Sequence, residues 1–201
     1  TYGYDSADNL VGIRDDYGNV FNFSYDSFGR KTRLDDPDLG VWSYLYDLTS
    51  NLIKQSNSEG TVRLGYDSLN RILQKNTTNY TLTFFYDKQY QGTLTNISHE
   101  SIHPAGENYS LVYDYDDRLR IIKETAHENG DAEVTGMTYD STDRVIEKAL
   151  ADGTDLDLYY NQQGKLDKIK GFINKTHYNA IGNPLNRTYF NSKITAFDYQ
   201  S

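Results

Sequence analysis

The sequence predicts an all-β chain built from consecutive antiparallel hairpins. Three observations predict it: a Tyr-Asp pair recurs about every 20 residues, turn-forming residues recur about every ten, and the segments between turns alternate apolar and polar residues. Alternation with period two is typical of a half-buried strand, and short strands bounded by regular turns are typical of hairpins. No sustained helical period is present, so no helix longer than about two turns is expected.

The Tyr-Asp pair defines an internal repeat. It occurs seven times in register, and three later copies keep the tyrosine while asparagine or glutamine replaces the aspartate. Ten of the 19 tyrosines follow this rule, at intervals of 18 to 27 residues. A fixed period of this length indicates one supersecondary unit per repeat. The predicted structural repeat positions are Tyr4, Asp5, Tyr25, Asp26, Tyr46, Asp47, Tyr66, Asp67, Tyr86, Asp87, Tyr113, Asp114, Tyr139, Asp140, Tyr160, Tyr178 and Tyr199.

Each repeat carries two turn signals. After Asp26, Gly29 stands three residues on and the basic Arg30 follows it, and most other repeats have a turn-forming residue at the first of these positions and often a basic residue at the second. An aspartate accepts hydrogen bonds from nearby backbone N–H groups, and glycine or asparagine tolerates the left-handed conformation that such a turn needs. A second signal, such as Asn129-Gly130, lies halfway through the unit. Two turns in about 21 residues leave two strands, so each repeat is predicted to be one hairpin.

The strand that leads into each tyrosine places its large apolar residues on one face. Phe21, Phe23 and Tyr25 alternate with Asn22 and Ser24, and later repeats do the same. The sheet should therefore have one apolar and one mainly wet face. The repeat tyrosines are expected to pack against neighbouring hairpins, with low exposure at Tyr25, Tyr46, Tyr66 and Tyr139. A sheet of about nine hairpins is too wide to stay flat, so it should curve.

The stretch YDSFGRKTRLDDPDLGVWSYLYD, residues 25–47, resembles the consensus of the YD-repeat or Rhs-repeat family, and the resemblance covers essentially the whole chain. It implies repeats that wind into a hollow spiral shell. Related shells enclose a C-terminal toxin domain in bacterial Rhs proteins and insecticidal toxin complexes, and teneurin shells form part of an adhesion receptor. The family's closing segment with its self-cleaving aspartates has no counterpart here, so no catalytic residue is carried over.

From this resemblance, residues 1–201 are expected to form a single YD/Rhs-repeat region of about nine hairpins, an excerpt of a longer shell. The expected function is a non-enzymatic shell or scaffold segment of a large secreted or cell-surface protein. Its expected partners are the rest of its own shell, an enclosed C-terminal toxin domain, and a cell-surface glycan or protein.

Composition narrows the alternatives. The net charge of −9 without a basic stripe argues against nucleic acid. The longest apolar runs, such as residues 84–86, are far below the roughly 20 residues that span a bilayer, so no membrane insertion by this segment is expected. The absence of cysteine excludes disulfides and thiolate sites. Asn-x-Ser/Thr sequons favour a location outside the cell, and they occur at Asn22, Asn76, Asn79, Asn96, Asn108, Asn174 and Asn186.

Two other functions stay open. His99-Glu100-Ser101-Ile102-His103 matches the His-Glu-x-x-His signature of zinc hydrolases, which needs a helix. Pro104 disfavours a helix there, and on a strand the two histidines would lie about 13 Å apart. We therefore predict no catalytic, cofactor-binding or metal-binding residue, and no cofactor, and keep a zinc hydrolase as the remote alternative. The nearer alternative is a carbohydrate-binding or cell-adhesion module whose exposed tyrosine rings stack on sugars.

The two repeats between Tyr86 and Tyr139 are longer than the others. Because both are lengthened by similar amounts, we expect extended strands that still pair, with hairpin tips at residues 104–106 and at Asn129-Gly130. His99 should then lie on a strand. These tips are the most individual part of a repetitive surface, so a specific partner is expected to contact them.

Overall fold

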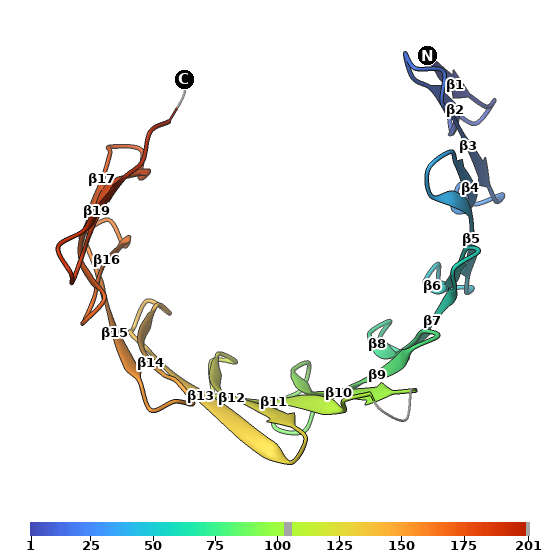
Figure 1. The fold of residues 1–201 in the computed structure, drawn as a ribbon. Helices are drawn as coiled ribbons and strands as arrows, with labels where there is room; N and C mark the ends of the chain where they lie inside the picture. The colour runs from blue at the N-terminus through green and yellow to red at the C-terminus, as the bar shows by residue number, and fades with distance from the viewer. Residues whose placement is uncertain (103–105, 200–201) are drawn as a thin grey trace. The chain divides into compact units, whose positions relative to one another are not determined.

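The computed structural model describes residues 1–102 and 106–199. Within these residues every regular element is a β-strand, and neighbouring strands pair antiparallel. The predicted fold class, an all-β chain of consecutive antiparallel hairpins, is confirmed (Figure 1). The described part of the chain contains no helix that is long and apolar enough to cross a membrane.

The contacts divide the chain into two compact units, of which the first comprises residues 1–87 and 94–110. Each of its strands pairs with the next one in sequence, from β1 to β10. The strands are β1 (Tyr2–Tyr4), β2 (Leu10–Arg14), β3 (Val20–Tyr25), β4 (Lys31–Asp36), β5 (Gly40–Tyr46), β6 (Leu52–Ser56), β7 (Thr61–Tyr66), β8 (Ile72–Asn76), β9 (Tyr80–Tyr86) and β10 (Leu94–Ser101).

The second unit comprises residues 88–93 and 111–201, and β11 (Tyr109–Tyr115) crosses the boundary between the two. From β12 to β19 each strand again pairs with its successor. The strands are β12 (Ile121–Glu128), β13 (Asp131–Tyr139), β14 (Val145–Ala149), β15 (Asp155–Tyr160), β16 (Leu166–Ile169), β17 (Ile173–Tyr178), β18 (Pro184–Tyr189) and β19 (Ile194–Ala196). Within each unit, taken by itself, successive strands rotate so that the sheet bends (Figure 1).

A β-bulge accompanies the repeat tyrosine. The register shifts between Ser24 and Tyr25 and between Leu45 and Tyr46, and it shifts in the same way before Tyr66, Tyr139 and later tyrosines. A bulge of this kind belongs to a turn whose last residue is left-handed, and it increases the local twist of the strand pair. The tyrosine therefore marks the point where each strand ends and the turn begins.

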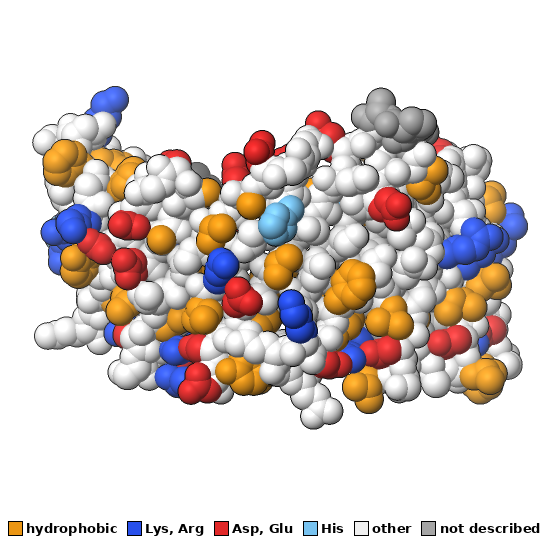
Figure 2. Space-filling model, turned by 90° about the horizontal axis from the view of Figure 1, so that it is seen from below, with side chains coloured by type: hydrophobic (Ala, Val, Ile, Leu, Met, Phe, Trp, Pro, Cys, Tyr) orange, Lys and Arg blue, Asp and Glu red, His pale blue; other side chains and the backbone are white. Residues whose placement is uncertain are grey.

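The sheet is a single layer, and its two faces differ in exposure. Along β3 the side chains alternate between exposed and half-buried, and Phe21, Phe23 and Tyr25 form the half-buried set. We call the face that carries the repeat tyrosines the tyrosine face and the opposite one the wet face. Among the described apolar side chains only Ile173 is buried, and it keeps 8% of its surface exposed. On the surface seen in Figure 2, apolar and charged side chains are scattered among the backbone and the remaining side chains.

The lengthened hairpins have the extended strands that the sequence predicts. β12 and β13 pair from Lys123–Gly136 to Glu128–Asp131, and Asn129 and Gly130 form the tip with positive φ angles of 51° and 96°. Positive φ at both central residues is typical of a tight type I′ hairpin turn. The tip at Asn129-Gly130 is therefore confirmed, whereas Pro104 and Ala105 of the other predicted tip lie outside the described residues.

Candidate functional site

The repeated turn is built around one carboxylate. In the second repeat, Asp26 Oδ1 accepts hydrogen bonds from the N–H groups of Phe28 and Arg30, at 2.9 and 3.0 Å. The backbone closes the loop, since the N–H of Asp26 donates to the carbonyl of Arg30 and the N–H of Gly29 donates to the carbonyl of Asp26. Gly29 has a φ of 75°, in the left-handed region that glycine adopts without strain. One aspartate side chain thus accepts the backbone N–H groups that the turn would otherwise leave without a partner.

The same acceptor geometry recurs along the chain. The side chain of the first turn residue accepts N–H bonds from the residues two and four positions later at Asp5, Asp47, Asp67, Asp116, Asp140, Asn161 and Asn179. These bonds stabilise the charged form of the carboxylates. The backbone N–H of Arg71 is the main cause that lowers the pKa of Asp67, and the side chain of Arg120 is the main cause at Asp116.

The repeat tyrosine joins one hairpin to the one before it. The Tyr25 hydroxyl donates to the carbonyl of Leu10 at 2.9 Å, across from the preceding repeat. The same bond is made by Tyr46 to Lys31, Tyr66 to Leu52, Tyr86 to Ile72, Tyr139 to Ile121, Tyr160 to Val145, Tyr178 to Leu166 and Tyr199 to Pro184. In each case the carbonyl belongs to the first residue of a strand in the preceding repeat. Each tyrosine therefore fixes the spacing between neighbouring hairpins.

Tyr25, Tyr46, Tyr66 and Tyr139 are half-buried, so their expected low exposure holds only in part. A single-layer sheet explains the difference, because each ring is covered along its edges by neighbouring strands and by no second layer. The covering is still sufficient to disfavour the phenolate, and burial raises the pKa of Tyr66 and Tyr139.

An arginine at the end of the turn reaches forward to the next repeat. Arg30 binds the carboxylate of Asp26 through Nε at 2.7 Å, and its Nη1 donates to the carbonyl of Asp47 at 2.9 Å. The guanidinium carbon lies 4.9 Å from the centre of the Tyr46 ring. An arginine stacked on an aromatic face while it binds a carboxylate has its planar group fixed on both sides.

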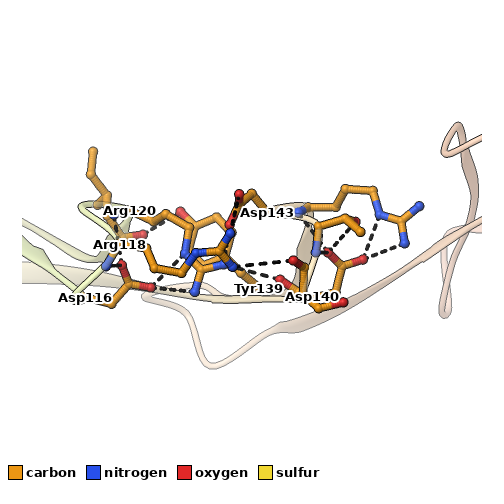
Figure 3. Close-up of polar contacts among 10 residues, drawn as sticks. Asp116, Arg118, Arg120, Tyr139, Asp140 and Asp143 are labelled. Carbon is orange, nitrogen blue, oxygen red and sulfur yellow. Dashed lines mark hydrogen bonds and ion pairs between the residues drawn. The ribbon is translucent and has the colours of Figure 1, made fainter.

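Figure 3 shows the fullest form of this arrangement, between the repeats that begin at Tyr115 and Tyr139. Arg120 binds Asp116 behind it and Asp143 ahead of it, at 2.6 and 2.8 Å, and its guanidinium lies 4.5 Å from the ring of Tyr139. Arg118 also binds Asp143, at 2.8 Å. Two of these three ion pairs, Arg118–Asp143 and Arg120–Asp143, crosslink two consecutive turns.

The structure shifts one of the predicted repeat positions. The sequence indicates Tyr113-Asp114, but the turn is formed by Tyr115-Asp116, since Asp116 accepts the two N–H bonds and closes the loop with Arg120. Tyr113 and Asp114 lie within β11. The shift places Leu119 at the left-handed position, with a φ of 62° that costs roughly 1–2 kcal/mol for a residue with a β-carbon. The amide side chain of Gln89 binds both backbone groups of Tyr115.

Asp87 also departs from the pattern. It has a positive φ of 66°, and its carboxylate accepts two hydrogen bonds from Arg71, at 2.9 and 2.7 Å. Its role is thus to receive the arginine of the preceding turn, which Asp143 does for Arg120. The adjacent Tyr86 keeps its bond to Ile72. The irregular segment after Asp87 explains why the repeat interval lengthens here.

His99 lies on β10, as the sequence predicts, and its partner in the zinc motif, His103, lies outside the described residues. Its ring stacks on Tyr109 with centres 4.3 Å apart and is tilted against Tyr80 at 5.1 Å. Glu100 is its neighbour along a strand, so the two side chains point to opposite faces. Within the described residues no three His, Asp or Glu side chains gather in a way that could hold a metal ion.

A shallow depression of about 560 Å³ lies on the tyrosine face of the second unit. Tyr115 and Tyr139 line it together with Met137, and Glu124 and Lys148 bring opposite charges to its rim. Because it is open, and because its Tyr139 ring is held by the hydroxyl bond to Ile121 and by Arg120, it is part of the sheet surface between two repeats.

The fold and the repeated turn define a β-hairpin repeat protein whose side chains link each hairpin to the next. The family model described as RHS Repeat matches residues 4–40, which include the turns at Tyr4 and Tyr25. The resemblance to the YD-repeat or Rhs-repeat family is thereby confirmed. No curated protein matches the chain at a significant level.

Solved structures share the fold. The chain is similar to part of the crystal structure of TcdB2-TccC3-Cdc42, with 17% identity, a TM-score of 0.65, and coverage of 99% of this chain and 13% of that chain. For the crystal structure of TcdB2-TccC3 the values are 17%, 0.64, 99% and 14%. For a Photorhabdus luminescens Tc holotoxin pore with a substitution in TccC3 they are 17%, 0.63, 98% and 13%. The chain thus spans about an eighth of the length of these proteins.

Proposed function

We propose that this chain is a non-enzymatic segment of the wall of a hollow β-shell, within a larger secreted or cell-surface protein, and that the shell encloses a C-terminal toxin or other cargo domain. The observation that carries the proposal is the use of the repeated side chains. The hydroxyl of the tyrosine, the carboxylate of the aspartate and the guanidinium of the arginine are all engaged in contacts within or between hairpins.

A wall needs such contacts more than a catalytic site does. A lone hairpin is marginal in water, and a chain of hairpins is stable only when each one contacts its neighbours. The tyrosine bond and the arginine contact add a side-chain link to each backbone pairing. The repeated charged and aromatic residues hold neighbouring hairpins at a fixed spacing. This use supports an architectural role for residues 1–201 as one repeat region.

The similarity to TcdB2-TccC3 structures supports a structural segment of a larger protein, because the same fold occurs there in chains several times longer than this one. The rest of the same shell would then be the first partner of this segment. Secretion or display at the cell surface is part of the proposal.

The carbohydrate-binding or adhesion module is the second candidate. The depression at Tyr115 and Tyr139 offers aromatic surface for it. The hydroxyl of Tyr139 is already used by the carbonyl of Ile121, and the ring is stacked against Arg120, so this surface is less available for a sugar than a free tyrosine would be. The strand conformation at His99 and Glu100 gives no support to the zinc hydrolase.

Electron microscopy of the full-length protein that contains this chain tests the proposal. We expect a closed shell with density inside, and we expect that a protease added to the intact protein leaves the enclosed domain uncut, whereas the domain is degraded after the shell is opened by denaturant. An extended ribbon without an interior, together with equal cleavage before and after denaturation, would refute the shell. Binding of glycans by such a ribbon would favour the adhesion module.

A further inference from the structure

The hairpin tip between β12 and β13 carries the chain's single Asn-Gly pair, Asn129-Gly130. Both residues are exposed, and both have a positive φ. The two strands pair as far as Glu128 and Asp131, so the connection consists of these two residues. Because glycine has no β-carbon, the side chain of the preceding asparagine can approach the glycine nitrogen closely. An asparagine in this position can react with its own backbone.

Other asparagines in turns are held in place by hydrogen bonds. The side-chain oxygen of Asn161 accepts the N–H groups of Gln163 and Lys165, at 2.9 and 3.0 Å. Asn57 and Asn179 act as acceptors in the same way. The amide group of such a residue is directed toward the later residues of its turn. It must break these bonds before its carbon can reach the backbone nitrogen that follows it.

Asn129 has no such restraint. Its side chain makes no hydrogen bond to any described residue, and the N–H of Gly130 donates to no described acceptor. A β-carbon built on Gly130 would meet no atom within 4 Å, so the space around the tip is open. The side-chain amide carbon of Asn129 and the backbone nitrogen of Gly130 are therefore both available for reaction.

The turn at Asp152-Gly153, between β14 and β15, shows the contrast. The N–H of Gly153 donates to the carbonyl of Leu150 at 3.0 Å. The carboxylate of Asp152 accepts the N–H of Thr154 at 2.9 Å. Both groups that would have to react in this turn are thus engaged in hydrogen bonds, although its sequence resembles that of the tip between β12 and β13.

We propose that Asn129 is a site of spontaneous deamidation through a succinimide. The Gly130 nitrogen loses its proton to solvent, and its electron pair forms a bond to the side-chain amide carbon of Asn129. The bond from that carbon to the side-chain nitrogen breaks, and ammonia leaves with the electron pair and a proton from water. Water then adds to either carbonyl of the ring, which opens to aspartate or to isoaspartate. Water is the co-reactant, and nothing is oxidised or reduced.

The reaction changes both the charge and the backbone of the tip. The new carboxylate lies near Glu128, Asp131 and Glu133, which line a small depression of about 210 Å³ together with Asn129. Like charges at short range repel one another. Isoaspartate also adds a methylene group to the backbone, which disturbs the geometry that a two-residue hairpin turn needs. The tip thus gains a charge and loses its regular shape, and this assignment does not rest on the proposed function.

The test is timed incubation of the purified chain in mildly alkaline buffer, once folded and once in urea. Peptide mapping by mass spectrometry reports each asparagine, because deamidation raises the mass by about one dalton. An isoaspartyl carboxyl methyltransferase with a labelled methyl donor measures the isoaspartate formed. We expect Asn129 to deamidate in the folded chain and to give mainly isoaspartate, whereas Asp152 should give none.

Gln162→Gly is the matched control, because it places a glycine after Asn161, whose side chain accepts two hydrogen bonds. Each bond that must break lowers the reactive population about fivefold, so Asn161 of this folded variant should deamidate at least about tenfold more slowly than Asn129. In urea the bonds of the turn are lost, and the two asparagines should react at equal rates. Asn129→Gln should abolish isoaspartate at the tip and leave the rates at other asparagines unchanged.

An Asn129 that stays unmodified in the folded chain overturns the assignment, whether or not it reacts in urea. Equal rates at Asn129 and at Asn161 of the folded Gln162→Gly chain would overturn the claim that the hydrogen bonds of the turn decide which asparagine reacts. Isoaspartate that persists in Asn129→Gln at the level of the unchanged chain would place the modification elsewhere and overturn the site.

Discussion

Removal of the Tyr66 hydroxyl should weaken the chain by a definite amount. Tyr66 donates to the carbonyl of Leu52 at 2.9 Å, and the ring is half-buried on the tyrosine face. Tyr66→Phe keeps the ring and deletes the donor, which leaves the carbonyl of Leu52 without that partner. An intramolecular hydrogen bond of this kind contributes about 1 kcal/mol net, so the free energy of unfolding should fall by about that amount.

The chain supplies its own probe and its own control. Trp42, the single tryptophan, lies on β5, which pairs with the β6 strand that carries Leu52. Its fluorescence during urea unfolding therefore reports the first unit. With a slope of roughly 1–3 kcal/mol per molar urea, a loss of about 1 kcal/mol lowers the midpoint by roughly 0.3–1 M. Tyr17 is 94% exposed and makes no hydroxyl bond to any described residue, so Tyr17→Phe should leave the midpoint unchanged.

Equal midpoints for Tyr66→Phe and the wild-type chain would refute the claim that the hydroxyl links the hairpins. An equal drop for Tyr17→Phe would show that the loss comes from hydroxyl hydration rather than from the bond to Leu52. A change in slope with no change in midpoint would instead indicate that the two-state treatment fails for this repeat array.

Three further outcomes are expected. Asp140→Asn should retain more stability than Asp140→Ala in thermal unfolding, because an amide oxygen can accept the same N–H bonds, as Asn161 does; equal losses would show that charge alone matters. Gly29→Ala should lower the free energy of unfolding by about 1–2 kcal/mol, since φ is 75°, whereas Gly65→Ala within β7 should be neutral or stabilising. The free energy of unfolding should fall as pH drops below about 4, because folding lowers the pKa of the turn aspartates. It should also fall as pH rises above about 10, because folding raises the pKa of repeat tyrosines such as Tyr66. A flat stability profile over either pH range would contradict the corresponding contacts.

The sequence predicts the fold well because each repeat carries the same turn and strand pattern. Seven copies of the turn give the same hairpin signal, and period two assigns the faces. One place where prediction and structure differ is the segment Tyr113-Asp114-Tyr115-Asp116. Both pairs have an arginine four residues after the aspartate, and a shift of two residues leaves every side chain on the same face.

Local preference favours the wrong register there, because Asp117 tolerates a left-handed turn better than Leu119 does. In the observed register Leu119 has a strained positive φ, but Arg120 contacts Asp116, Asp143 and the ring of Tyr139. These contacts offset the strain. Asp143 and Tyr139 belong to the next repeat, so a prediction made from one turn at a time cannot include their contacts with Arg120. The tyrosine hydroxyl bonds are beyond the sequence for the same reason, since each one joins two hairpins.

These contacts explain why the two faces of the sheet have different roles. On the tyrosine face and in the repeat turns, hydrogen-bond donors and acceptors are matched between neighbouring hairpins. A substitution there would therefore mainly change the spacing between hairpins. The wet face and the second set of turns carry no such repeat requirement, and the sequence varies there from hairpin to hairpin. A partner that distinguishes this chain from another of the same fold is therefore expected to bind to the wet face or to the projecting tips.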